Sequence, residues 1–220
     1  MSDLEVHRTA DGSRTLFNPA LSESYHSMYG AVTESEHVFI RMGLQVMNKP
    51  HIDLLEIGLG TGLNLLLTWI EAERKGIMVR YTAIEPDPVP ATTLLELDHC
   101  AVLGEEHRRD AFLAMMASTP DQVARPQTGF DFRLATHQSA LATSSYDLIY
   151  FDAFAPNVQP ELWTVDRFQH MHDLLRPNGI LVTYSAKGAV RRAMQQVGFR
   201  VERLPGPPGK LEMLRAIKPS

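Results

Sequence analysis

Short apolar runs alternate with amphipathic stretches along the chain, and from His51 onward they predict strands alternating with helices. Runs of about four to eight apolar residues are typical of buried strands, whereas apolar positions that recur about every three or four residues are typical of helices. Strands are predicted at residues 52–57, 79–84, 130–134, 146–152, 180–184, 199–204 and 210–217. Helices are predicted at residues 33–46, 64–75, 88–102, 111–117, 160–175 and 189–197, with a helix stop at 176–179. The polar stretch 118–128 is predicted to be a loop.

This alternation favours an α/β fold in which helices cover both faces of a mostly parallel, seven-stranded sheet. We expect the last strand, 210–217, to be antiparallel. In such sheets the carboxyl ends of the first and fourth strands flank a ligand crevice, where the strand order reverses. The first 50 residues differ in character and carry turn signals at 11–14 and 18–19. We expect residues 1–50 to form a cap or lid packed on a main domain of residues 51–220.

Composition narrows the class of protein. The chain of 220 residues is 44% hydrophobic and 21% charged, which excludes a disordered chain. Its one cysteine and the absence of clustered Cys and His indicate no disulfide framework and no metal site. No signal peptide and no apolar run of about 18 residues is present, so we expect a soluble cytoplasmic protein.

The charge is unevenly distributed. The net charge of −5 argues against a uniformly basic surface that binds nucleic acid. Residues 187–218, however, contain eight Lys or Arg and two Glu, a segmental charge of +6. This segment is a candidate footprint for phosphates. The alternative is a solvated helix face.

A glycine loop follows the first predicted strand of the main domain. Gly58, Gly60 and Gly62 stand at alternate positions, with Glu56 before them and Asn64 after them. Glycines permit positive φ angles and allow a ligand to approach the backbone closely. The spacing differs from the GxGxxG of dinucleotide folds, and Glu56 would repel a pyrophosphate. Glu56 would instead attract a cationic amino group, such as that of S-adenosylmethionine.

Two further carboxylates end predicted strands. Glu85 ends the second strand, where a carboxylate accepts hydrogen bonds from both hydroxyls of a ribose. The glycine loop, Glu56 and Glu85 together predict S-adenosyl-L-methionine as the cofactor. Asp152 ends the fourth strand and therefore lies beside the same crevice by topology. Each feature also has a structural alternative. The glycine loop would be a tight turn between a strand and a helix, Glu85 a solvated residue at a strand end, and Asp152 a helix cap.

The block DAFAP at 152–156, followed by PELW at 160–163, resembles the methyltransferase domain of the MnmC type. Further matching blocks are residues 11–16, 30–40, 56–64, 188–192 and 210–214. The resemblance implies a Rossmann-like class I methyltransferase that converts 5-aminomethyl-2-thiouridine at the wobble position of tRNA to 5-methylaminomethyl-2-thiouridine. Family members fused to a flavin oxidoreductase make their own precursor. We expect this chain to be a stand-alone methyltransferase.

The resemblance also suggests roles for single residues. Asp152 would hydrogen-bond the acceptor amine and stabilise the positive charge that develops on its nitrogen. Phe154 is the best candidate platform for a splayed anticodon base. The other proposed substrate contacts are His26, Ser27, Glu34, Pro156, Trp163 and Lys210. His137 and Gln138 stand where the family carries an aspartate that meets the adenine, so they are the expected adenine contacts.

Each assignment has an alternative. An aromatic residue in such a segment is often part of the core, and the N-terminal blocks would equally suit a structural cap. The alternative functions are methylation of a small molecule or a protein, and a non-catalytic binding module on the same fold. A nicotinamide oxidoreductase is disfavoured by the glycine spacing.

Overall fold

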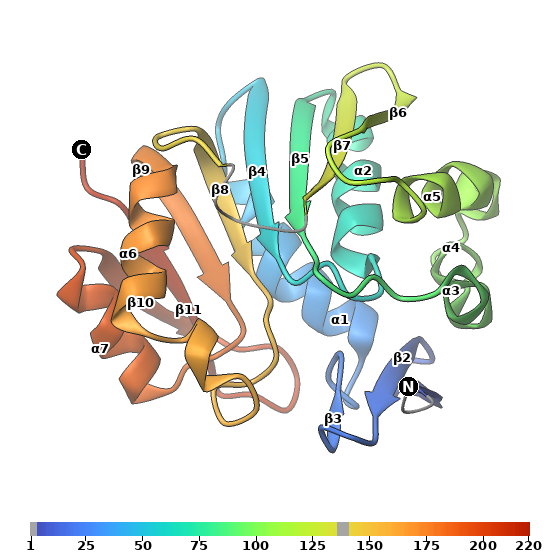
Figure 1. Cartoon of the computed structure of the whole chain (residues 1–220), viewed down its shortest axis with the longest axis horizontal. Helices are drawn as coiled ribbons and strands as arrows, with labels where there is room; N and C mark the ends of the chain where they lie inside the picture. The colour runs from blue at the N-terminus through green and yellow to red at the C-terminus, as the bar shows by residue number, and fades with distance from the viewer. Residues whose placement is uncertain (1–3, 136–140) are drawn as a thin grey trace.

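The computed structural model describes residues 4–135 and 141–220, so the expected adenine contacts His137 and Gln138 lie outside the described residues. Its main feature is an eight-stranded sheet with the order β10-β11-β9-β8-β4-β5-β7-β6 (Figure 1). The strands are β4 (His51–Ile57), β5 (Met78–Ile84), β6 (Val123–Gln127), β7 (Phe130–Ala135), β8 (Tyr146–Phe151), β9 (Leu175–Thr183), β10 (Arg200–Pro205) and β11 (Glu212–Ile217).

The sheet is mostly parallel, as predicted for a Rossmann-like fold. β4 pairs in parallel with β5 and β8, β5 with β7, and β8 with β9. β11 runs antiparallel to β9 and β10, which confirms the expected direction of the last strand. β4 and β8, the predicted first and fourth strands, are neighbours, so the strand order reverses between them. Their carboxyl ends point toward the edge where β2 and β3 lie (Figure 1).

The strand count of seven was wrong because β6 lies in the stretch predicted to be a loop. β6 is an edge strand that pairs antiparallel with β7 alone, and its register shifts between Ala124 and Gln127. Pro126 lies within that irregularity, where a missing backbone donor is tolerated. An exposed edge strand with a proline carries no alternating apolar pattern, so periodicity did not detect it.

The helices differ from the prediction mainly where they break. The predicted helix 88–102 is two helices, which meet at Asp98 with φ of +43°. The predicted helix 160–175 divides into η5 and α6; α6 ends at Leu174, as the predicted stop requires, and residues 176–179 belong to β9. The helices are α1 (Ala31–Ser35), η1 (Glu36–Arg41), η2 (Leu44–Val46), α2 (Leu63–Lys75), α3 (Ala91–Leu97), α4 (His99–Val102), η3 (Glu106–Arg108), α5 (Arg109–Met116), η5 (Pro160–Leu162), α6 (Val165–Leu174) and α7 (Gly188–Gln196). No described helix has the length and apolar character needed to span a bilayer.

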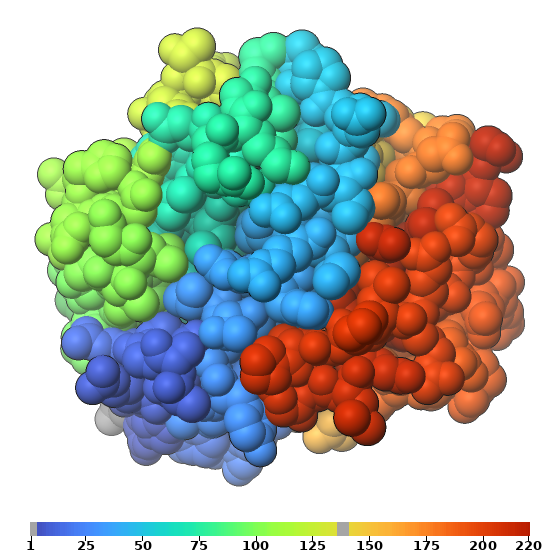
Figure 2. All heavy atoms as spheres, turned by 180° about the vertical axis from the view of Figure 1, so that it is seen from behind, coloured from blue at the N-terminus to red at the C-terminus, as the bar shows by residue number. Residues whose placement is uncertain are grey.

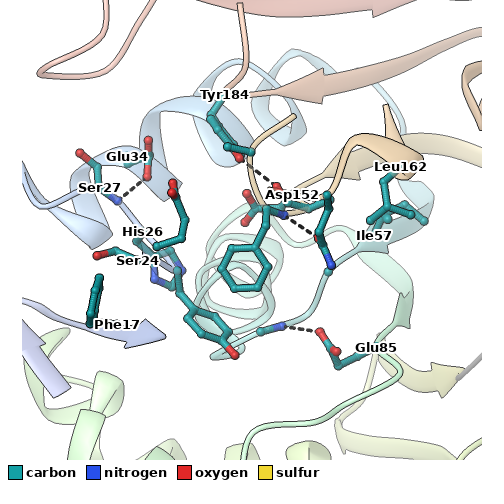
Figure 3. Close-up of a pocket in the computed structure, with 18 of the residues that line it drawn as sticks. Phe17, Ser24, His26, Ser27, Glu34, Ile57, Glu85, Asp152, Leu162 and Tyr184 are labelled. Carbon is teal, nitrogen blue, oxygen red and sulfur yellow. Dashed lines mark hydrogen bonds between the residues drawn. The ribbon is translucent and has the colours of Figure 1, made fainter. Parts of the chain in front are cut away.

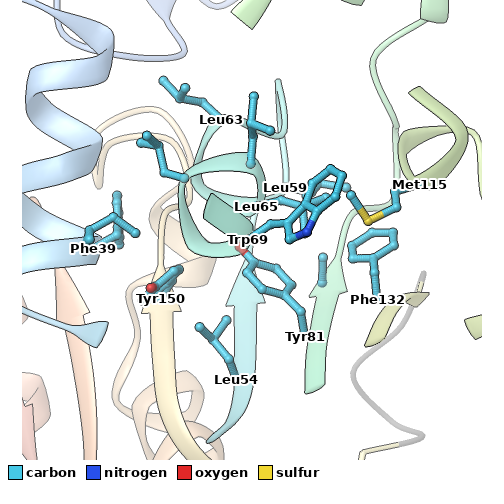
Figure 4. Packing of buried hydrophobic residues seen from close by; sticks show 14 of the residues in the cluster. Phe39, Leu54, Leu59, Leu63, Leu65, Trp69, Tyr81, Met115, Phe132 and Tyr150 are labelled. Carbon is cyan, nitrogen blue, oxygen red and sulfur yellow. The ribbon is translucent and has the colours of Figure 1, made fainter. Parts of the chain in front are cut away.

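The two faces of the sheet carry separate apolar clusters. Leu54 of β4 packs in the cluster that includes Trp69 of α2, whereas its neighbour Leu55 packs in the cluster that includes Phe168 of α6. This follows from the alternation of side chains along a strand. Figure 4 shows Trp69, Tyr81 and Leu54 in the first cluster.

The N-terminal residues form a second, small sheet that periodicity missed. It contains β1 (Glu5–Arg8), β2 (Arg14–Asn18) and β3 (Glu23–Ser24) in antiparallel order. These strands are short and mostly polar, so they show no apolar run. The helical segment that follows, predicted at 33–46, comprises α1, the π-helical η1 and η2. Figure 2 shows, from behind, the C-terminal segment against this N-terminal part, where His37 is hydrogen-bonded to the Pro205 carbonyl at 2.8 Å.

Phe39 of η1 anchors the N-terminal part to the sheet, and its loss should destabilise the whole chain. Its ring is fully buried and lies 5.0 Å from that of Tyr150. We expect Phe39→Ala to lower the free energy of unfolding by about 3–5 kcal/mol, because it leaves a cavity. Leu95→Ala, at a side chain 53% exposed, is the control and should change it by less than about 0.5 kcal/mol. Urea unfolding measures both, and equal effects would contradict this account of the packing.

Candidate active site

A cavity of about 830 Å³ opens at the carboxyl ends of the parallel strands (Figure 3). Its volume lies within the range of about 300–1,000 Å³ that is usual for small-molecule sites. The main sheet contributes the residues that follow β4, β5 and β8, and the N-terminal part contributes most of the opposite wall. Of the predicted site residues, the cavity is lined by His26, Ser27, Glu34, Gly58, Gly60, Glu85, Asp152, Phe154 and Lys210.

The glycine loop brings bare backbone to the cavity. Gly58 has φ of +88°, and a Cβ there would lie 2.6 Å from the carbonyl oxygen of Asp152. Gly60 has φ of +50° and also lines the cavity. Gly62 does not line it, because it caps α2, where a Cβ would lie 2.5 Å from Sδ of Met116. Gly58 therefore allows close packing against the Asp152 backbone, Gly62 allows packing against Met116, and Gly60 lines the cavity beside the Tyr25 ring.

Glu85 faces the cavity from the end of β5. Its Oε2 accepts a hydrogen bond from the Gly60 amide at 3.1 Å, and its Oε1 accepts one from the Asp87 amide at 3.0 Å. Burial raises the pKa of the Glu85 carboxyl, and the hydrogen bond from Gly60 opposes that shift. Each carboxylate oxygen can accept a further hydrogen bond, so Glu85 retains acceptors for two hydroxyls.

Glu56 does not line the cavity, contrary to the predicted contact with a ligand amino group. The residue is fully buried, and its carboxyl accepts hydrogen bonds from the Tyr81 hydroxyl at 2.7 Å and the Asn64 amide at 2.9 Å. Burial raises its pKa well above the usual range, and the hydrogen bonds from Tyr81 and Asn64 oppose that shift. The alternation along β4 explains the error, since Glu56 shares the α2 side of the sheet with Leu54.

Asn64 links Glu56 to Asp152. Its Nδ2 donates to Oε1 of Glu56 at 2.9 Å and to Oδ2 of Asp152 at 2.8 Å. Asn64 is buried and does not line the cavity. The structure therefore places it to position the Asp152 carboxyl, and not to make the predicted contact with the cofactor. The first turn of α2 thereby fixes the carboxyl group at the end of β8.

The Asp152 carboxyl reaches the cavity but has little water around it. Burial raises its pKa to about 7, and the nearby Glu34 carboxylate acts in the same direction. The hydrogen bond from Asn64 and the positive charge of Lys210 oppose the shift. Asp152 is therefore a carboxyl group that gains and loses a proton near neutral pH, as a general base requires.

Three residues from distant parts of the chain meet across the cavity from the glycine loop. Glu34 accepts a hydrogen bond from the Ser27 amide at 2.7 Å and forms an ion pair with Lys210 at 2.5 Å. The Lys210 ammonium lies 4.0 Å from the ring centroid of Tyr184, which is a cation–π contact. The Tyr184 hydroxyl donates to the Ala153 carbonyl at 2.9 Å. Sequence reasoning missed Tyr184, although its place just after β9 is a signal of the kind used for Asp152.

His26 forms part of the N-terminal wall. Its Nδ1 lies 3.0 Å from Oγ1 of Thr15, and its ring contacts His99 edge to face at 6.5 Å. Burial lowers the pKa of His26 to about 4, so the ring is neutral at physiological pH. His26 therefore adds a polar group to the cavity without adding charge.

The aromatic candidates separate into two groups. Phe154 lines the cavity and meets Tyr25 edge to face at 4.9 Å. Trp163 is only 7% exposed, packs against Phe151 and donates from Nε1 to the Phe154 carbonyl at 2.8 Å. Trp163 and Pro156 do not line the cavity; the packing of Trp163 departs from its predicted contact with the substrate, whereas the contact of Pro156 stays a prediction. The core interpretation holds for Trp163 because the tryptophan side chain fills the space beneath the loop that carries Phe154.

The basic segment 187–218 is less basic at its surface than its composition suggests. Arg200 and Arg215 pair with Glu202, and Arg203 pairs with Glu212. Lys218 donates to two backbone carbonyls. Three cations at the start of α7 remain without a carboxylate partner among the described residues; they are Lys187, Arg191 and Arg192. The described residues also contain no group of three or more His, Cys, Asp or Glu arranged to hold a metal ion.

Comparison with known proteins gives consistent matches. A model of a family described as S-adenosyl-L-methionine-dependent methyltransferase matches residues 129–219. The chain is 30% identical over 213 residues to the tRNA 5-methylaminomethyl-2-thiouridine biosynthesis bifunctional protein MnmC of Cupriavidus necator, covering 90% of this chain and 32% of the relative. It is 28% identical over 238 residues to the MnmC protein of Magnetococcus marinus, covering 98% and 34%. The chain thus spans about a third of the length of these relatives.

Solved structures share the fold. The crystal structure of MnmC2 from Aquifex aeolicus aligns with a TM-score of 0.75 at 24% identity, covering 98% of this chain and 70% of that one. Spermidine synthase from Thermotoga maritima aligns with a TM-score of 0.54 at 15% identity, covering 97% and 71%. These likenesses establish a class I methyltransferase fold, and the resemblance found in the sequence extends over nearly the whole chain. Together these matches support an S-adenosyl-L-methionine-dependent methyltransferase domain of the MnmC type.

Proposed function

We propose that the chain methylates the 5-aminomethyl group of the wobble (2-thio)uridine in tRNA, giving 5-methylaminomethyl-2-thiouridine. The names of the similar bifunctional proteins contain that product. The observation that carries the proposal is the Asp152 carboxyl, which faces the cavity beside the glycine loop with a pKa of about 7. An amine acceptor needs such a group, because a primary alkyl amine is mostly protonated at neutral pH.

The residues present fit S-adenosyl-L-methionine. Gly58 and Gly60 line the cavity with backbone that carries no Cβ, and Glu85 offers acceptors for the two ribose hydroxyls. The cofactor, when bound, supplies a methyl group on a positively charged sulfur. The carboxyl groups that line the cavity, when ionised, attract that positive charge.

Asp152 is the proposed proton acceptor. It takes one proton from the acceptor ammonium, which leaves a neutral amine with a free lone pair. The neutral nitrogen would then accept the methyl group that the bound cofactor would supply from its sulfur, and it would become a secondary ammonium. Asp152 next releases its proton to water, so one proton is produced per turnover. Asn64 holds the carboxyl in place throughout, at 2.8 Å.

The opposite wall is the proposed acceptor site. Phe154 and Tyr25 supply aromatic surface for a base splayed out of an anticodon loop. His26, Ser27, Glu34 and Lys210 are the proposed polar contacts with the aminomethyluridine. Lys187, Arg191 and Arg192 are the proposed contacts with the RNA backbone, because α7 begins shortly after Tyr184 of the cavity wall. The internal pairing of the other cations favours a second candidate function, methylation of a small amine.

Removal of the Asp152 carboxylate should abolish most of the methyl transfer. We expect Asp152→Asn to lower kcat by about 10²–10⁴-fold, since proton acceptance is lost, while calorimetry still detects cofactor binding. The assay follows tritium from labelled cofactor into tRNA that carries the aminomethyl group.

In the unchanged protein kcat/KM should rise with pH and level off above about 7, where Asp152 is ionised. A fully active Asp152→Asn would refute the role, and transfer to free amines but not to tRNA would favour the second candidate.

A side chain at Gly58 should prevent cofactor binding, whereas one at Gly76 should not. Both residues have positive φ, of +88° and +64°, so each alanine strains the backbone by about 1 kcal/mol. Only the Cβ at Gly58 meets backbone, at 2.6 Å from the Asp152 carbonyl oxygen, and the space around Gly76 is empty within 4 Å. We expect Gly58→Ala to weaken cofactor binding by more than about tenfold in calorimetry. An equal affinity for the two variants would contradict the proposed cofactor site.

The unpaired cations of α7 should matter for tRNA and not for the cofactor. We expect Lys187→Ala combined with Arg192→Ala to raise the KM for tRNA by about 3–10-fold and to reduce its salt dependence. Arg203→Ala is the matched control, since the same charge is lost but Glu212 already pairs with it. If the control raises the KM as much as the double variant, these cations are not the RNA contacts.

A further inference from the structure

The cavity holds more acidic than basic side chains, and this creates a chemical problem for an amine acceptor. The described lining residues include Glu23, Glu34, Glu85 and Asp152, against the cations Arg167 and Lys210. Acidic surroundings attract an alkylammonium ion. The same surroundings stabilise its protonated form, which has no lone pair and cannot accept a methyl group.

Lys210 lies where its positive charge offsets this stabilisation of the protonated amine. Its ammonium pairs with Glu34 at 2.5 Å and contacts the ring of Tyr184. Tyr184 in turn donates to the carbonyl of Ala153, the residue next to Asp152. The positive charge of Lys210 also acts on Asp152, because it lowers the pKa of that carboxyl. One cation thus pairs with Glu34 on the acceptor wall and also acts electrostatically on Asp152 beside the glycine loop.

The loop between β10 and β11 holds Lys210 in this place. The Gly206 amide donates to the Leu211 carbonyl at 3.0 Å, and the Lys210 amide donates to the Pro207 carbonyl at 2.9 Å. Gly209, with φ of +84°, lies against the ring of Tyr29, where a Cβ would be 2.3 Å from Cδ2. The backbone that carries Lys210 is therefore a closed turn packed on the N-terminal part.

We propose that Lys210 is a positioning residue for proton transfer, which keeps the acceptor site in the charge state that favours a neutral amine. The inference rests on the proposed function and adds a role that is distinct from a contact with the substrate. Lys210 balances Glu34, which belongs to α1, and opposes the attraction of Asp152 for the ammonium proton. A positive neighbour makes both the acceptor ammonium and the Asp152 carboxyl release a proton more readily.

The groups around Lys210 determine in which direction the pH–rate profile shifts when its charge is removed. These are Glu34 of α1, Asp152 after β8, Tyr184 after β9 and the neutral His26 of the N-terminal wall. Without the Lys210 charge, Glu34 is left unbalanced, and both Asp152 and the acceptor hold their protons to higher pH. The acidic limb of kcat and of kcat/KM therefore moves toward higher pH.

The test compares pH–rate profiles of four variants on aminomethyl tRNA. Lys210→Met should move the acidic limb up by about 0.5–1 pH unit, and Lys210→Arg, which keeps the charge, should leave it in place. Arg203→Met removes one positive charge outside the cavity lining, where Glu212 pairs with it, and should also leave the limb unmoved. Glu34→Gln combined with Lys210→Met removes both charges and should return the limb toward its original position, which a loss of packing would not do.

Three results would overturn the inference. One is a limb that does not move in Lys210→Met. Another is a limb that does not return in the double variant. The third is a cofactor affinity more than about tenfold weaker in Lys210→Met with an unchanged limb, since Lys210 would then hold the cofactor carboxylate. If the unchanged protein transfers no methyl group to tRNA at any pH, the proposed function itself fails, and the inference falls with it.

Discussion

The side-chain amide of Asn64 donates one hydrogen bond to Glu56 and one to Asp152, and the arrangement of the cavity depends on this pair of bonds. Asn64 thereby joins the first turn of α2 to the ends of two neighbouring parallel strands, β4 and β8. Gly62 allows the chain to turn into α2 with a left-handed conformation, so Asn64 reaches both carboxyl groups. Tyr81 satisfies the second oxygen of Glu56, and Asp152 is left with its remaining lone pairs toward the cavity.

Burial gives these two carboxyl groups different properties. Glu56 has no access to solvent, burial raises its pKa well above the usual range, and it acts as a hydrogen-bonding support for Asn64. Asp152 reaches the cavity and has a pKa of about 7, which suits the proposed exchange of protons with an amine. This arrangement costs stability: between about pH 4 and about pH 7 the folded chain retains a proton that the unfolded chain has lost, so the site becomes destabilising as the pH rises. A raised pKa of this kind is typical of functional sites.

The position of the cavity could be predicted from the sequence, because parallel strands bring their carboxyl ends to one edge. Glu85 and Asp152 end such strands, and both line the cavity. Glu56 could not be placed this way, since its direction depends on which face of β4 carries α2. Trp163 was misplaced for a related reason: a family block identifies a residue but does not say whether its side chain packs beneath the loop or above it. The small N-terminal sheet and β6 lack an apolar pattern, and the Glu34–Lys210 pair joins residues 176 positions apart, which no local pattern reveals.

The protonation of Asp152 is the central claim, and its most direct measurement is a carboxyl ¹³C NMR titration of protein labelled at aspartate, with Asp152→Asn used to assign the signal. The account predicts a titration midpoint for Asp152 at about pH 7, several pH units above that of an exposed aspartate. A midpoint at about pH 4, the usual value for aspartate, would contradict it, because Asp152 would then be an ordinary ionised side chain with no capacity to exchange a proton near neutral pH.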